Sequence, residues 1–334
     1  MKFASLAAIA DLADSLPRAD EAAEQAAVAR QNSLTKPPGS LGRLEELAAF
    51  MAAWRGTARP EITRAQALVF AGNHGICAQG VNPYPQEVTA QMVGNFQAGG
   101  AAINQLCRAN GAELSVIALE LDRPTADFTQ APAMSEAECL AAMQAGADAV
   151  DLTADVLILG EMGIGNSTIA AAMTSALFGG DVKDWVGAGT GSDHAGIGRK
   201  IAAIEAGLVR HQGLGAMGVL GALGGREQAA ICGAVLAARA ARIPVILDGF
   251  ICTAAASALF AADARLLDHC LVGHCSAEPG HRKLLGALGK KAVLDFDMRL
   301  GEGSGAALAL GILRSALAVH NGMATFGEAG VSEA

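Results

Sequence analysis

Apolar residues follow two different patterns along the chain, one before residue 60 and one after it. In the first part they recur three and four residues apart in segments 3–16, 22–29 and 41–54, which predicts helices. From about Gln66, short continuous apolar runs alternate with helical stretches, and the runs cover residues 67–71, 114–119, 156–159, 185–186, 245–247 and 270–272. Such runs are typical of strands that helices cover on both faces. The second pattern therefore predicts repeated β-α units that form an α/β fold with a Rossmann-like parallel sheet and helices on both faces.

Two further segments frame this sheet. The Ala- and Leu-rich segment 305–319 predicts an apolar helix that packs against the N-terminal helices. Between segments 22–29 and 41–54, two prolines and two glycines at residues 37–42 predict a rigid link, with the next helix capped near Ser40.

Composition and charge limit the classes of function. The chain has 334 residues, of which 52% are hydrophobic and 17% charged, so it can bury one large core. A net charge of −9 with only 4% aromatic residues argues against a nucleic-acid surface. Charged residues interrupt every long apolar stretch, and Asp11 and Asp14 interrupt the first one, which argues against a membrane span and a signal peptide. We expect a cytoplasmic protein that acts on small molecules.

The cysteines and histidines do not indicate a metal site. The seven cysteines include no Cys-x-x-Cys pair, so we interpret them as small buried residues in a reducing compartment. Two His-Cys pairs, at 269–270 and 274–275, lack a typical ligand spacing, and we expect no metal. His74 has two interpretations, a substrate hydrogen bond or a structural contact.

Polar residues and glycines follow the predicted strands, at the edge where parallel sheets bind ligands. The most specific of these segments is Gly-Ile-Gly-Asn-Ser-Thr at residues 163–168, just before a predicted helix. Free backbone N–H groups, the helix N-terminus and the hydroxyls of Ser167 and Thr168 would bind an anion such as phosphate. Lys200 is the cation that we expect to join them. A purely structural turn is the alternative interpretation.

Glu302 lies between glycines in the sequence Gly-Glu-Gly-Ser-Gly at residues 301–305, where a strand crosses to a helix. Glycines let the chain approach a small planar ligand closely, so this carboxylate is our candidate proton acceptor. The alternative is an acidic residue that merely suits a helix N-terminus. Tyr84, the only tyrosine, and Met92 are candidates for stacking on an aromatic ligand; a turn residue and a core residue are the alternatives.

Taken together, six segments resemble the nicotinate-nucleotide:dimethylbenzimidazole phosphoribosyltransferase family, whose product supplies the lower ligand of cobalamin. They lie in order over nearly the whole chain, at residues 36–45, 73–75 with 84–100, 160–168, 247–250, 274–278 and 298–306. The resemblance implies transfer of phosphoribose from nicotinate mononucleotide to dimethylbenzimidazole with inversion. It also implies a homodimer with no metal or redox cofactor, a large domain at residues 61–304, and a small helical domain from residues 1–60 and 305–334.

The resemblance also assigns roles to single residues. It implies that Glu302 is the general base and Glu161 a second carboxylate of the site. The nucleotide and its phosphate are then expected at Gly163, Gly165, Asn166, Ser167, Thr168, Lys200 and Ser276, and the base at Tyr84, Met92 and Leu300. Asn73 and Cys275 differ from the residues of some relatives, so the contacts with nicotinate and the base specificity are not fixed by this comparison.

Two other classes of function compete with this interpretation. A nucleotide-binding module without catalysis would use the same anion turn but would need no central carboxylates. A dinucleotide-dependent oxidoreductase would need Gly-x-Gly-x-x-Gly after the first strand, where this chain has Gly72-Asn-His-Gly75. Release of nicotinate from the nucleotide separates these classes from the transferase.

Overall fold

A computed structural model describes residues 1–332 and contains one parallel sheet of six strands. The strands are β1 (Ala65–Ala71), β2 (Ala112–Ala118), β3 (Val156–Met162), β4 (Val245–Leu247), β5 (Cys270–His274) and β6 (Ala292–Leu294). Their order across the sheet is β2-β1-β3-β4-β5-β6, and all neighbouring strands are parallel. The α/β class and the parallel sheet predicted from the apolar runs are confirmed.

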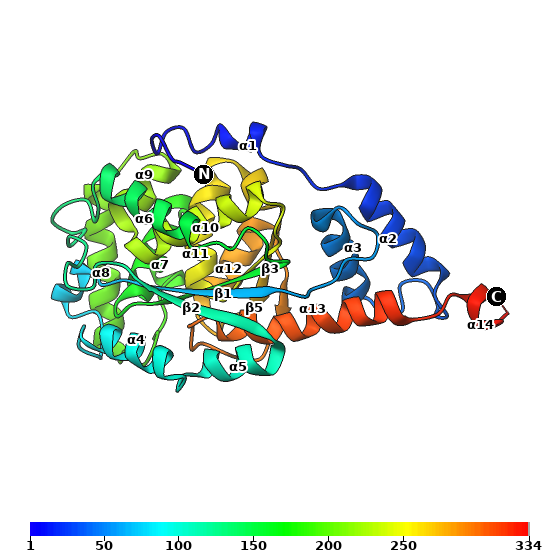
Figure 1. Ribbon diagram of the computed structural model, residues 1–334. Helices are drawn as coiled ribbons and strands as arrows, with labels where there is room; N and C mark the ends of the chain where they lie inside the picture. The colour runs from blue at the N-terminus through cyan, green and yellow to red at the C-terminus, as the bar shows by residue number, and fades with distance from the viewer. Residues whose placement is uncertain (333–334) are drawn as a thin grey trace.

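Side chains that alternate along the central strands fill two separate apolar layers, one on each face of the sheet. Leu68, Phe70, Leu157 and Leu159 belong to the larger layer, whereas Ala67, Val69, Val156 and Ile158 belong to the smaller one. Figure 1 shows α4, α5 and α13 on one side of the sheet and α6, α9 and α10 on the other. Continuous apolar runs are therefore required, because both faces of these strands are covered.

The helices fall into two groups according to the layer in which their buried residues lie. The larger layer contains α1 (Leu12–Ser15), α6 (Glu136–Asp148), α7 (Asn166–Phe178), α8 (His194–Arg210), α9 (Ala216–Leu223), α10 (Arg226–Ala240), α11 (Phe250–Ala262) and α12 (Pro279–Leu288). The smaller layer contains α3 (Arg43–Arg55), α4 (Val88–Ala98), α5 (Ala102–Asn110) and α13 (Ser304–Gly322).

The C-terminal end of α13 joins α2 (Glu21–Ser33) and α3 in a lobe at one end of the molecule, near the short helix α14 (Phe326–Ala329) (Figure 1). Arg30 of α2 donates to the carbonyls of His320, Asn321 and Met323 at distances of 2.8, 3.2 and 3.0 Å, which satisfies acceptors at the end of α13. The predicted packing of the C-terminal helix on the N-terminal helices is confirmed. The exact domain boundaries stay a prediction, and residues 333–334 of the small domain lie outside the described part.

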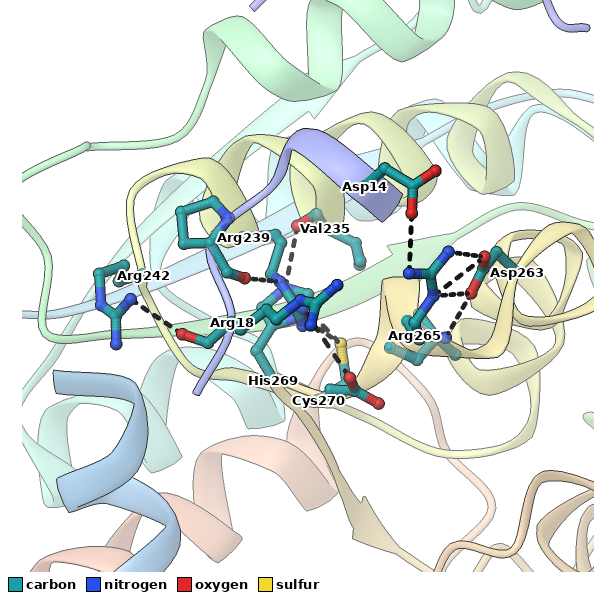
Figure 2. A network of polar contacts seen from close by, with 12 residues as sticks. Asp14, Arg18, Val235, Arg239, Arg242, Asp263, Arg265, His269 and Cys270 are labelled. Carbon is teal, nitrogen blue, oxygen red and sulfur yellow. Dashed lines mark hydrogen bonds and ion pairs between the residues drawn. The ribbon is translucent and has the colours of Figure 1, made fainter. Parts of the chain in front are cut away.

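Three arginines attach the N-terminal segment to the large body of the molecule, as Figure 2 shows. Arg239, only 2% exposed, donates to the carbonyl of Pro17 at 2.6 Å and lies 4.3 Å from the centre of the Trp54 ring. Arg242 donates to the carbonyl of Arg18 at 2.9 Å, and Arg265 donates to Asp14 at 2.9 Å. The chain is thus fixed where it crosses from the large body to α2.

Three predicted elements differ from the structure. Residues 185–186 form no strand: they follow a 3₁₀ turn at Val182–Asp184, and Trp185 is buried as a loop residue whose indole N–H donates to the carbonyl of Gly179 at 2.9 Å. The sixth strand is instead β6, which is short and only partly buried. In segment 3–16 only Leu12–Ser15 is α-helical, although Ile9, Ala13 and Leu16 are buried.

The link at residues 37–42 also differs in one detail. Ser40 is exposed and does not cap α3; the residue before the helix is Gly42, whose φ of 52° lies in the left-handed region. Glu45 satisfies the link instead, because its Oε1 accepts from Lys36 Nζ at 2.7 Å and from the Leu41 N–H at 3.0 Å. Among the described helices, none combines the length and apolarity that a membrane crossing requires.

Helices α6 and α10 touch backbone to backbone through two glycines. A Cβ atom at Gly146 would lie 1.9 Å from the carbonyl oxygen of Ala230, and one at Gly233 would lie 1.8 Å from that of Met143. These contacts leave no room for any side chain, so α6 and α10 approach as closely as their backbones allow.

We expect Gly233→Ala to lower the free energy of unfolding by about 1–3 kcal/mol or more, because the new methyl group forces two packed helices apart. Chemical denaturation monitored by circular dichroism measures the change. Gly94→Ala in α4 is the matched control, since nothing lies within 4 Å of its added Cβ and alanine favours a helix. Equal stability of the two variants would contradict the inferred contact.

Candidate active site

A cleft opens at the carboxyl ends of β3, β4 and β5 and beside the loop that leads into α13. Its lining comprises Glu161, Met162, Gly163, Ile164, Asn166, Ser167, Gly189, Thr190, Asp248, Gly249, Phe250, Ile251, His274, Ser276, Glu278, Arg299, Leu300, Gly301 and Glu302. These residues come from five separate segments of the chain, four of which lie at or beyond the carboxyl ends of the strands β3, β4, β5 and β6. The structure therefore brings Glu302 and the turn at residues 163–167 into one cleft.

Glu302 is the middle of three consecutive residues with positive φ. The φ angles of Gly301, Glu302 and Gly303 are 86°, 65° and 86°, which is uncommon for a residue with a side chain and costs about 1 kcal/mol or more. Asp248, directly after β4, holds this loop: its carboxylate accepts from the N–H of Gly303 at 3.1 Å and of Ala306 at 2.9 Å. Gly160 of β3 lets this loop come close to the sheet, since a Cβ at Gly160 would lie 2.5 Å from the Gly303 nitrogen.

The carboxyl group of Glu302 is 7% exposed and lies at the N-terminal end of α5, where the backbone N–H of Ile103 donates to it. Its Oε2 atom is buried and has no hydrogen-bond partner within residues 1–332. Burial, and then the charge of Asp248, raise the pKa of Glu302 above its ordinary value. An acceptor oxygen is thus free, on a group more basic than an ordinary carboxylate.

Glu161 lies near the end of β3 and is 5% exposed, with its Oε2 accepting a hydrogen bond from the Asn166 amide. A Cβ at Gly301 would lie 2.4 Å from Glu161 Oε1, so Glu161 and the Glu302 loop are in direct proximity. Burial, followed by the charge of Asp248, raises the pKa of Glu161 to about 8, with Glu227 and Glu302 contributing in the same direction. At neutral pH this group is mostly protonated.

The predicted anion turn begins α7, as expected. Gly165 precedes the helix with a φ of 94°, so only a glycine fits without strain. Thr89 of α4 fixes the turn by accepting from the Ile164 N–H at 3.1 Å. Asn166 and Ser167 line the cleft, whereas Thr168 is fully buried and does not belong to the lining.

Lys200 of α8 reaches the anion turn. Its Nζ donates to Ser167 Oγ and to the carbonyl of Gly187, both at 3.1 Å, and the residue is 3% exposed. Burial lowers the pKa of Lys200, while the charge of Glu278 opposes this change. A buried ammonium that shares a hydroxyl with a helix N-terminus can bind a phosphate oxygen.

Of the four remaining residues predicted to contact substrate, two line the cleft and two do not. Ser276 and Leu300 line the cleft, and Ser276 is 4% exposed whereas Leu300 is 52% exposed. Tyr84 is 50% exposed and Met92 packs partly against the smaller apolar layer; both lie outside the lining. Their contact with a base stays a prediction. Arg299 lines the cleft as a cation that can meet a carboxylate, whereas Arg43 lies outside the lining.

Sequence reasoning did not identify three buried acids that organise the site. Asp248 holds the Glu302 loop, Glu278 Oε1 accepts from the Gly189 N–H at 2.9 Å, and Glu227 lies 2.7 Å from His74 Nε2. The positions of Asp248 and Glu278 after strands were a usable signal. For Glu227 the sequence offers no signal except that an acidic residue lies in an apolar helix.

Of the histidines and cysteines singled out in the sequence, only His274 lines the cleft, and the others lie outside it. His269 interacts with the Val235 carbonyl at 3.0 Å, His274 lies 3.6 Å from Asp248, and His74 contacts Glu227 instead of lining the cleft. Six of the seven free cysteines are buried and Cys77 is half-buried. Within the described residues, no group of three or more His, Cys, Asp or Glu side chains is placed to hold a metal ion.

Comparison with known proteins agrees with this geometry. A family model described as "Phosphoribosyltransferase" matches residues 16–331, so the protein is an enzyme of the phosphoribosyltransferase class. Proteins named nicotinate-nucleotide–dimethylbenzimidazole phosphoribosyltransferase are similar over nearly their full length: that of Rhodobacter capsulatus is 70% identical over 99% of both chains, and that of Ruegeria pomeroyi 60% identical over 98% of both. The chain belongs to the nicotinate-nucleotide:dimethylbenzimidazole phosphoribosyltransferase family.

The fold is likewise that of a solved relative. The crystal structure of CobT from Thermus thermophilus superposes with a TM-score of 0.88 at 43% identity, covering 94% of this chain and 100% of that chain. The predicted family and fold class are therefore confirmed.

The raised pKa of Glu161 makes stability depend on pH. A carboxyl whose pKa rises from 4.5 to about 8 on folding stabilises the folded protein fully below pH 4.5, and this stability is lost as the pH rises to 8. We expect Glu161→Gln to remove that dependence, which amounts to on the order of 5 kcal/mol at most. Denaturation midpoints measured from pH 5 to 9 check this; parallel curves for the two proteins would refute it.

Proposed function

We propose that this enzyme transfers the 5-phosphoribosyl group of nicotinate mononucleotide to 5,6-dimethylbenzimidazole or a similar aromatic base, giving α-ribazole 5′-phosphate and nicotinate. The observation that carries the proposal is the placement of the free Glu302 Oε2 and the turn near Gly165 in one cleft. In one ribosyl group, the anomeric carbon that the aromatic base attacks and the 5-phosphate are at opposite ends. Glu302 would act at the first end, and the turn would bind the second. Family membership supports these substrates and a role in cobalamin biosynthesis.

Glu302 acts as the general base in this proposal. A benzimidazole that attacks through its lone-pair nitrogen becomes a cation unless its N–H loses a proton. The free Oε2 accepts that proton, and the raised pKa of Glu302 makes it a stronger acceptor than an exposed glutamate. Because the group must be ionised to act, the rate falls as the pH drops below this raised pKa.

Glu161 holds the ribose in this proposal. With a pKa of about 8 it is mostly protonated at neutral pH, so it donates a hydrogen bond to a ribose hydroxyl while Asn166 donates to its other oxygen. As positive charge develops on the ribose in an oxocarbenium-like transition state, the Glu161 carboxyl group stabilises that charge electrostatically while it keeps its proton. One carboxyl thus serves both binding and charge stabilisation.

The anion turn and Lys200 fix the phosphate, which leaves the anomeric carbon open to attack from one face. Direct displacement then inverts the β-nucleotide to an α-riboside. Nicotinate leaves from a ring nitrogen that already carries positive charge, so it needs no strong acid. Met162, Phe250 and Ile251 line the cleft and exclude water, which would otherwise hydrolyse the nucleotide.

The finer properties of the protein follow the family. We propose a cytoplasmic homodimer that works without a metal or redox cofactor. Large apolar side chains on the surface support association: Val28 is 44% and Phe296 65% exposed.

The purified enzyme should release nicotinate when it is incubated with nicotinate mononucleotide and dimethylbenzimidazole, as chromatography can follow. We expect Glu302→Gln to fold normally and to lose about 10²–10⁴-fold in turnover, because the proton acceptor is gone. Glu113→Gln, which changes an exposed carboxylate on β2, should be fully active. Absence of nicotinate release would reject the proposed function, and undiminished turnover of Glu302→Gln would reject the assigned base.

Lys200→Ala should raise the KM for the nucleotide about tenfold or more and leave the KM for the base nearly unchanged, since a charged hydrogen bond to phosphate contributes about 1.5–3 kcal/mol. Steady-state kinetics with each substrate varied in turn measures both constants. Lys183→Ala is the control, because that lysine is exposed and pairs only with Asp181. An equal rise in both constants would argue against a phosphate contact.

A further inference from the structure

Three glycines leave space for two buried side chains, those of His74 and Glu227, behind the anion turn. A Cβ at Gly72 would lie 2.3 Å from Glu227 Oε2, and one at Gly163 would lie 2.9 Å from His74 Nε2 and 3.0 Å from Glu227 Oε1. A Cβ at Gly225 would lie 2.4 Å from His74 Cε1. Gly163 also lines the cleft, so its one side faces the cleft and its other side the pair.

The pair is costly for stability. His74 and Glu227 are both 0% exposed, with 2.7 Å between Nε2 and Oε1. Despite this short distance, none of the side-chain nitrogen and carboxylate oxygen atoms of His74 and Glu227 has a hydrogen-bond partner with suitable geometry in the described part of the chain. A buried polar atom without a partner costs about 1–3 kcal/mol, so this arrangement is not explained by stability alone.

The anion turn rests on the pair and on two further contacts. Cys77 Sγ lies 3.2 Å from the carbonyl of Ile164, and Thr89 accepts from the Ile164 N–H. Gln86 in turn holds the His74 segment by donating to the His74 carbonyl at 2.8 Å. The position of the turn is thus determined by residues that do not line the cleft.

The charge of Glu227 also acts on Glu161, which lies two residues before Gly163. The titratable groups facing Glu161 are Asp248, Glu227 and Glu302, with the Asn166 amide on its other side. Glu227 itself faces His74 and Cys77, and its neighbour Arg226 turns outward to Glu120 and Glu138. His274 lies beside Asp248. No arginine or lysine among these described neighbours neutralises Glu227.

We propose that His74 and Glu227 form a positioning pair for the transferase site: their bulk seats the anion turn through Gly163, and the Glu227 carboxylate, packed against the turn that follows Glu161, acts on that acid through space. Neither residue contacts substrate. The role of this pair in catalysis rests on the proposed function. Its two effects, the seating of the turn and the action of the Glu227 charge on Glu161, can each be measured without turnover.

The charge effect is tested by Glu227→Gln, which keeps the shape of the side chain and removes its charge. Glu161→Gln is made in the wild-type and in the Glu227→Gln background, and the loss of pH-dependent stability that it causes is compared between the two backgrounds as a double-mutant cycle. We expect the midpoint assigned to Glu161 to move to lower pH by about one unit in Glu227→Gln. An unmoved midpoint in the folded variant overturns the charge effect and with it the proposal.

The seating effect is tested by Glu227→Asp, which keeps the charge and withdraws the carboxylate from Gly163. We expect the dissociation constant of nicotinate mononucleotide, measured by calorimetry, to rise about tenfold, and the Glu161 midpoint to stay. Unchanged affinity overturns the proposal. Glu227→Asp also keeps the test decisive if Glu227→Gln does not fold.

His269→Gln is the matched control, because His269 is equally buried but precedes β5 toward the opposite edge of the sheet. It should lower the thermal midpoint yet change neither the Glu161 midpoint nor nucleotide affinity. If His269→Gln changes both as Glu227 variants do, a general loss of packing explains them and the proposal fails. Absence of nicotinate release by the wild type would reject the proposed function separately, since the stability measurement is independent of turnover.

Discussion

The carboxylate of Asp248 is the interaction on which the candidate site depends. It accepts from the Gly303 and Ala306 N–H groups, which begins α13 and holds the three residues of positive φ at 301–303. An acidic side chain at a helix N-terminus is favourable by itself, because it satisfies free donors and the helix dipole. Here the same contact stabilises a strained Glu302 and turns its carboxyl group into the cleft. Without it, the loop would lose the only described acceptor for the Gly303 N–H and the general base would lose its position.

Burial of several acids in one region follows from this arrangement. Asp248, Glu161, Glu302 and Glu227 are all buried, and the charges of the other three raise the cost of ionising Glu161. Such a cluster lowers stability, which is typical of sites in which a protein gives up stability for activity. The cluster suits a substrate whose reacting ring and ribose develop positive charge, since the transition state then brings the compensating charge that the free protein lacks.

The sequence predicted the parts of the site that depend on local rules. Residues after strands β3, β4, β5 and β6 meet in the cleft because parallel strands end at one edge, and the turn before α7 is recognisable from its glycines and hydroxyls. It did not predict Glu227, because an acid in an apolar helix looks exposed until the fold places His74 beside it. Trp185 differs from the predicted strand for a related reason, because a buried loop residue has the same apolar pattern as a buried strand. The sixth strand is β6, which is short and partly exposed and therefore lacks a clear apolar run.

Helix α13 links the site to the lobe formed by α2 and α3. Its first turn follows Glu302 closely and is fixed by Asp248, its middle packs on the sheet, and its last carbonyls accept from Arg30. A helix held at both ends and along its length moves as one body, because shifting one end breaks hydrogen bonds at the other. The orientation of the lobe and the position of the general base are therefore mechanically coupled. The catalytic loop lies directly before this helix, so the residue most sensitive to geometry is attached to an element that is anchored at both ends.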